Sequence, residues 1–124
     1  MKIFALLGAV FALIGVAAGA FGSHGLEGRV DQRMLEVWQT GVQYQMYHAL
    51  GLFVAAWLYG ETQAITALVM GWSFTAGILV FSGSLFLMVF TGARGLGAIT
   101  PIGGVAMLAG WVCCILSVLK LGSG

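Results

Sequence analysis

Charged residues are scarce in this sequence, and their scarcity excludes several classes of protein. Only 7% of the 124 residues are charged, the formal net charge is +1, and 60% are hydrophobic. Soluble domains carry about 25% charged residues, so this chain would expose a largely apolar surface to water. Nucleic-acid binding is also disfavoured, because it requires a basic surface that neutralises phosphates. The composition therefore indicates a single domain, residues 1–124, whose main partner is the lipid bilayer.

Acidic residues are rare as well, and none lies inside a long apolar stretch. A proton-linked transporter usually carries a carboxylate within the membrane. A serine-histidine site usually has a third group that orients the imidazole. The sequence therefore favours a non-catalytic protein. A pairing of Ser82 or Ser84 with His48 keeps a membrane-embedded enzyme as an alternative. The acids are Glu27, Asp31, Glu36 and Glu61.

The cysteines give no sign of a metal site or a disulfide. Cys113 and Cys114 are adjacent within an apolar run, and a bridge between neighbours is strained. The two histidines and six methionines form no HxxxH or Met-x-x-Met pattern, and CxxC is absent. Soft ligands in such patterns would suit copper or zinc. We therefore expect no metal and no cofactor.

Four apolar stretches are long enough to cross a membrane, which requires about 20 residues each. They cover approximately residues 3–22, 37–59, 64–90 and 99–121. The first also resembles a secretory signal, although its apolar part is long for one, and we expect it to be retained. Short links, "GETQ" and "TGARGLGA", make the later spans antiparallel neighbours. The predicted fold is an all-α, integral membrane four-helix bundle with both termini on the same side.

The first link, residues 23–36, differs from the other two. Its apolar residues Leu26, Val30 and Met34 recur at helical spacing, while Arg29 and Arg33 fall on other faces. This pattern is typical of an amphipathic helix in the plane of the membrane interface. The link is therefore predicted to form a short interfacial helix.

Glycine is abundant, and its spacing indicates helix packing. Small residues three or four apart let membrane helices approach closely. Together with the short links and the lack of catalytic acids, these stripes favour a structural or accessory subunit. Such a subunit would associate with itself or with a larger membrane complex. The packing positions are Gly8, Ala12, Gly15 and Gly19 in the first span, and Gly103 and Gly104 in the fourth.

Polar side chains gather in one half of the predicted bundle. His48 lies eleven residues after the start of the second span at Val37, which is about 15 Å deep at 1.5 Å per residue. Intramembrane polar groups face the bundle interior or a water-filled cavity. Two interpretations remain open: a pocket that binds or transports a small molecule or ion, and a purely structural hydrogen-bonded cluster. The candidate pocket consists of His48, Tyr44, Ser82, Ser84, Thr100 and His24.

Four blocks of sequence resemble a small family of uncharacterised membrane proteins that includes the bacterial proteins YgdD and YwdK. The blocks are "GAFGSHGLE", "YQMYHALGL", "FSGSLFLM" and "LGAITPIGG", in that order. The resemblance covers nearly the whole chain. It implies a four-helix protein of the bacterial inner membrane, with mitochondrial relatives in animals, and it implies no known activity. One departure is Ser23, where alanine is expected. The family's characteristic residues fall on His24, Gly25, Tyr44, Tyr47, His48, Ser82, Gly83, Ser84, Thr100, Pro101 and Gly103.

Overall fold

The computed structural model describes residues 2–122, and within that range it contains helices and no strand. This confirms the predicted all-α class. The segments α3, η1 and α4 follow one another without a break, so they form a single helical rod, here called the third rod. The elements are α1 (Lys2–His24), α2 (Gln32–Thr62), α3 (Ile65–Gly77), η1 (Ile78–Ser82), α4 (Gly83–Thr91), η2 (Arg94–Ala98) and α5 (Thr100–Val118).

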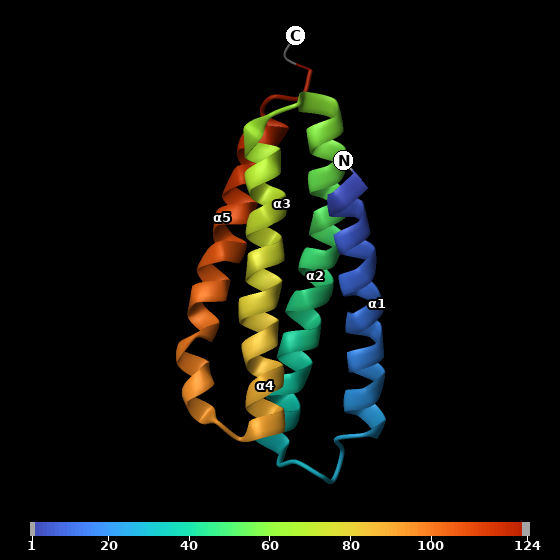
Figure 1. The fold of residues 1–124 in the computed structure, drawn as a ribbon, viewed down its shortest axis with the longest axis vertical. Helices are drawn as coiled ribbons and strands as arrows, with labels where there is room; N and C mark the ends of the chain where they lie inside the picture. The colour runs from blue at the N-terminus through green and yellow to red at the C-terminus, as the bar shows by residue number, and fades with distance from the viewer. Residues whose placement is uncertain (1, 123–124) are drawn as a thin grey trace.

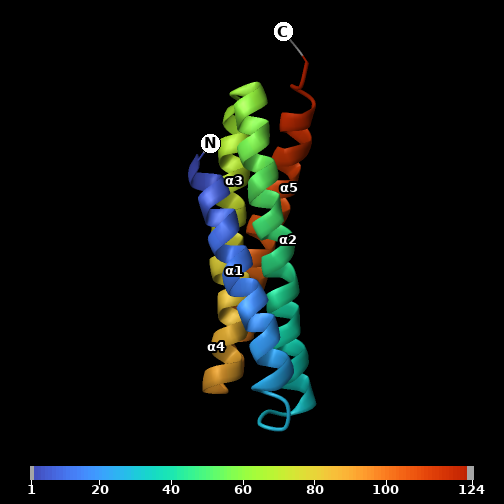
Figure 2. The same ribbon diagram turned by 90° about the vertical axis from the view of Figure 1, so that its right-hand side faces the viewer.

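The long helices lie side by side and alternate in direction (Figure 1). α2 packs against α1 on one side and against the third rod on the other, while α5 packs mainly against α3. Figure 2, turned by 90°, shows the same elongated arrangement. α1 begins and α5 ends at the same end of the molecule, which is uppermost in Figure 1. The opposite end holds the link from α1 to α2 and the link from α4 to α5.

Within residues 2–122, three segments are long and apolar enough to cross a membrane: Lys2–Gly22, Ile65–Thr91 and Arg94–Val118. α2 is 31 residues long but is not apolar enough to join them. Its sequence is interrupted by polar side chains such as Gln43, Gln45 and His48. The crossing of the membrane by residues 37–59 therefore stays a prediction.

The link between α1 and α2 does not form the separate interfacial helix predicted over residues 23–36. Residues 25–30 form turns and bends, and Gly28 has a φ of 80°, which favours glycine. α2 already begins at Gln32, so residues 32–36 are its first turn. The apolar spacing serves the core instead of an interface, because Leu26 and Met34 are buried beside Trp38.

Asp31 sets the start of α2 as its N-cap. Its Oδ1 accepts a hydrogen bond from the backbone N–H of Met34 at 2.8 Å. We expect Asp31→Ala to lower the free energy of unfolding by about 1 kcal/mol, because a backbone donor loses its acceptor. Asp31→Asn keeps an acceptor oxygen and should stay within about 0.5 kcal/mol. Thermal unfolding in detergent, followed by circular dichroism, measures both; equal losses in the two variants would contradict the capping role.

The small-residue stripe of α1 faces α2. A Cβ added at Gly8 would lie 2.8 Å from the carbonyl oxygen of Ala49, and one at Gly15 would lie 2.5 Å from the sulfur of Met46. At Gly19 the nearest atom, on Val42, is 3.4 Å away. Ala12 is half-buried on the same helix. The stripe thus lets α1 approach a helix of the same chain.

The two glycines near the start of α5 differ sharply. A Cβ at Gly103 would meet the backbone nitrogen of Phe81 and would lie 2.8 Å from its Cα. A Cβ at Gly104 would lie 3.8 Å from the Phe81 ring, an ordinary contact. Gly103 therefore brings the backbone of α5 against that of the third rod, at the π-helical segment η1.

Candidate functional site

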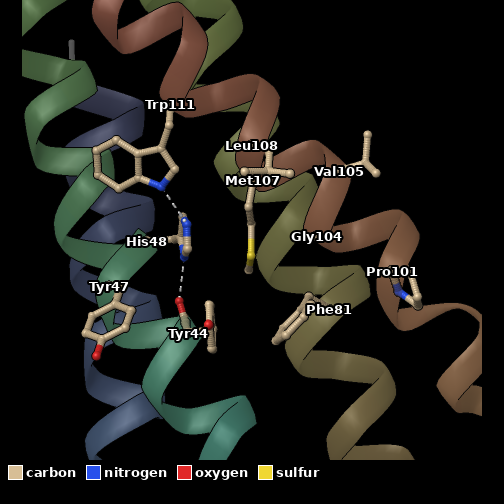
Figure 3. Close-up of a pocket in the computed structure, with 10 residues that line it drawn as sticks. All are labelled: Tyr44, Tyr47, His48, Phe81, Pro101, Gly104, Val105, Met107, Leu108 and Trp111. Carbon is tan, nitrogen blue, oxygen red and sulfur yellow. Dashed lines mark hydrogen bonds between the residues drawn. The ribbon is translucent and has the colours of Figure 1, made fainter.

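His48 lies in the interior of the structure and links three elements. Its Nε2 accepts a hydrogen bond from the indole N–H of Trp111, with 2.9 Å between the nitrogens, and its Nδ1 lies 2.7 Å from the carbonyl oxygen of Tyr44 (Figure 3). The indole is a donor only, so Nε2 must be unprotonated. Nδ1 therefore carries the proton and donates it to the Tyr44 carbonyl. The imidazole is neutral, with both nitrogens engaged.

Aromatic rings hold the imidazole in place. The Tyr44 ring is nearly parallel to it, with 6.3 Å between ring centroids and 13° between planes. Phe74 of α3 meets it edge-on at 5.1 Å, and Trp111 of α5 lies at 5.7 Å. Only 3% of His48 is exposed. The orientation of the ring is thus fixed from three elements.

A pocket of about 480 Å³ lies between α2 and α5, with His48 in its wall (Figure 3). Ligand pockets typically measure about 300–1,000 Å³ and are mostly apolar with a few polar groups. This one fits that description, because its walls are chiefly aromatic and aliphatic. We call it the aromatic pocket. Its lining residues are Tyr44, Tyr47, His48, Phe81, Pro101, Gly104, Val105, Met107, Leu108 and Trp111.

The structure separates the six polar residues that the sequence placed in one pocket. Only His48 and Tyr44 line the aromatic pocket. Ser82 is buried and its hydroxyl donates a hydrogen bond to the carbonyl oxygen of Gly41 at 2.7 Å. This bond fastens the third rod to α2.

Ser84 and Thr100 form a second polar contact, away from His48. Their hydroxyl oxygens are 2.6 Å apart, and Ser84 also donates to the carbonyl oxygen of Phe81. This pair joins α4 to the start of α5. His24 is exposed at the end of α1, and the side chain of Ser23 lies outside the described part of the structure. The hydroxyls of Ser82, Ser84 and Thr100 are thus engaged in contacts between helices, and none of the three residues lines the aromatic pocket.

Sequence reasoning did not include Trp111, the partner of His48. One signal was present: a buried or half-buried indole N–H usually finds an acceptor, and few acceptors exist inside the apolar spans. Phe81 and Met107 were also not singled out, because an apolar residue within an apolar span gives no distinguishing signal. Both line the aromatic pocket.

A second pocket, of about 380 Å³, lies where α2 begins and α4 ends. Its lining includes two arginines and is otherwise mainly apolar, and we call it the arginine pocket. Phe81 and Pro101 line both pockets, so the two are neighbours along the groove between α2 and α5. The residues of the arginine pocket are Arg33, Met34, Val37, Phe81, Leu85, Met88, Arg94, Gly97, Thr100 and Pro101.

Comparison with known proteins finds relatives along nearly the whole chain. The family model described as "Protein of unknown function (DUF423)" matches residues 18–104. The "UPF0382 membrane protein YwdK" of Bacillus subtilis is 50% identical over 121 residues, which are 97% of this chain and 98% of that protein. A UPF0382 membrane protein of Staphylococcus haemolyticus is 46% identical over 120 residues, with the same shares covered. No solved structure matches.

Proposed function

This chain belongs to the family of proteins of unknown function designated DUF423, and we propose that it is a membrane protein that holds a lipid-soluble molecule in the aromatic pocket without catalysing a reaction. Its relatives in bacteria are named membrane proteins, which supports a place in the bacterial inner membrane. In the proposed arrangement α1, α2, the third rod and α5 all cross the bilayer as a four-helix bundle. α2, packed between α1 and the third rod, is the fourth span.

The observation that carries the proposal is the aromatic pocket with its fully engaged histidine. A general base needs a nitrogen free to take a proton from the substrate, and both nitrogens of His48 are bonded to Trp111 and Tyr44. The pocket walls are apolar and open between two helices whose outer faces expose residues such as Leu108. A lipid-soluble molecule can therefore enter sideways from the bilayer and bind by apolar contact.

Filling the pocket tests the proposal. Val105 is 65% exposed and lines the pocket, so Val105→Trp should occupy it. In liposomes that contain a trace of lipid with a diazirine on its acyl chain, light should crosslink the wild-type protein preferentially at the pocket segment of α5. We expect Val105→Trp to reduce crosslinking there about tenfold, as mapped by mass spectrometry.

Val112→Trp is the matched control. It lies two turns further along the same helix, is 55% exposed and does not line the pocket. Its pocket labelling should equal that of the wild type. Labelling spread evenly over the exposed faces of α1 and α5, and unchanged by Val105→Trp, would contradict the proposal.

The accessory-subunit role predicted from the sequence remains a prediction. One of its arguments was the glycine stripe, and Gly8 and Gly15 face α2 of the same chain. Association with another copy or with a larger complex would use other surfaces. The serine-histidine enzyme is disfavoured by geometry, because Ser82 bonds to Gly41 and Ser84 to Thr100.

A further inference from the structure

We infer that the molecule held between α2 and α5 is a phospholipid whose phosphate lies between Arg33 and Arg94, with one acyl chain in the aromatic pocket. This inference rests on the proposed function and names the ligand class. It follows from the arginine pocket, which the proposed function does not use. Both arginines line that pocket, and its lining includes no acidic side chain.

The charges at this end of the molecule suit a phosphate. An arginine guanidinium offers planar, paired donors that match phosphate oxygens. Arg94 lies 3.7 Å from the carboxylate of Asp31, but the two side chains are 68% and 60% exposed. Such an exposed ion pair contributes little and leaves other guanidinium donors available. Glu36 lies beside Arg33 in an adjoining pocket rather than in this one.

The two pockets match the two parts of a phospholipid: the arginine pocket suits the charged headgroup, and the aromatic pocket suits an acyl chain. Arg33 and Arg94 lie near the links at one end, where the headgroup region of the bilayer is expected. From Arg33 to His48 the helix α2 runs fifteen residues, which is about 22 Å at 1.5 Å per residue. Phe81 and Pro101 line both pockets. An acyl chain attached to a phosphate at the arginines would therefore pass them and reach the aromatic pocket.

Native mass spectrometry of the delipidated protein tests the headgroup contact. Phosphatidylglycerol and a diacylglycerol with the same acyl chains are added in parallel, since only the first has a phosphate. We expect the wild type to retain more phosphatidylglycerol. Arg33→Gln should lower the apparent affinity of the protein for phosphatidylglycerol about tenfold, because a charge-assisted hydrogen bond is lost. Arg94→Gln should act similarly, while Arg33→Lys should fall between.

Arg29→Gln is the control, because Arg29 is exposed at the same end and lines neither pocket. It should bind phosphatidylglycerol as the wild type does, and a thermal melt of each variant checks folding. Equal retention of the two lipids, or no effect of Arg33→Gln beyond that of Arg29→Gln, would overturn the phosphate site and leave the aromatic pocket in place. If Val105→Trp also retained both lipids unchanged, the proposed function itself would fail.

Discussion

Replacing Gly103 with alanine is expected to lower the free energy of unfolding by about 3 kcal/mol. The added methyl would meet the backbone nitrogen and Cα of Phe81. A side chain could rotate away, but the backbone of the third rod cannot. The helix α5 must therefore move away from the third rod. Overpacking of this kind typically costs about 1–3 kcal/mol, and a backbone obstacle places Gly103 at the upper end of that range.

A second glycine shows that the close approach is mutual. A Cβ at Gly77 of α3 would lie 3.2 Å from the carbonyl oxygen of Gly103 and would meet the side chain of Met107. Moving α5 outward would therefore loosen Met107, which is 4% exposed and belongs to the main apolar core. The loss should spread beyond the mutated residue.

Gly104→Ala is the matched control at the next position. Its Cβ would lie 3.8 Å from the Phe81 ring, and alanine has a higher helix propensity than glycine by up to about 1 kcal/mol. The variant should be as stable as the wild type or slightly more so. Unfolding in mixed micelles with increasing SDS, followed by circular dichroism, measures both variants. Equal stability of the two would contradict the backbone contact between α5 and the third rod.

The sequence predicted the elements of the fold better than their ends. Long apolar stretches indicate long helices, and the all-α class and the order of the long helices follow from them. The ends are set by individual contacts. α2 begins at Gln32 because Asp31 caps it, five residues before the predicted start at Val37. α5 ends at Val118, three residues before the predicted end at Leu121.

The candidate site was only partly predictable. A sequence indicates how far along a helix a residue lies, but not toward which neighbouring helix its side chain points. His48 lies eleven residues after Val37, and Trp111 lies eleven residues after Thr100. Both helices begin at the same end of the molecule, so the two residues lie at about the same height along it. Equal height made a contact between them possible. Which face of α5 turns toward α2 depends on packing around Gly103 and Phe81, and no local pattern encodes it.

Ser82 and Ser84 show the same limit of the sequence information. They lie on different faces of the third rod, where Ser82 contacts Gly41 and Ser84 contacts Thr100. Residues two apart on a helix do not share a face, and Ser82 is itself the last residue of the π-helical segment Ile78–Ser82. The sequence placed both serines in one half of the bundle but did not indicate which helix each one contacts.

His48→Ala is expected to lower the free energy of unfolding by about 2–4 kcal/mol. The substitution leaves a cavity among Tyr44, Phe74 and Trp111, and removing large buried side chains has costs in this range. It also removes the acceptor of the Trp111 indole N–H. Hydrocarbon offers that donor no replacement, because lipid contains no hydrogen-bonding partner at this depth.

His24→Ala provides the comparison, because His24 is exposed at the end of α1. Substitutions of exposed residues usually change the free energy of unfolding by less than about 0.5 kcal/mol. The loss of stability should therefore be several-fold larger for His48→Ala than for His24→Ala. SDS titration of the purified protein measures both variants. Similar losses at the two positions would mean that His48 does not connect the helices as the structure shows.

A double-mutant cycle separates the hydrogen bond from the cavity. Trp111→Phe keeps an aromatic ring and removes the donor, so His48 loses its Nε2 partner. The packing lost with the smaller ring is measured by the single variant and cancels in the cycle. If the bond between His48 and Trp111 contributes, the double variant should be more stable than the sum of the single losses predicts, by about 1 kcal/mol, the usual size for an interhelical bond in a membrane. Strict additivity would mean that the hydrogen bond adds nothing and that His48 stabilises the fold by packing alone. Trp111 would then not hold Nε2, and that nitrogen would be free to act as a base.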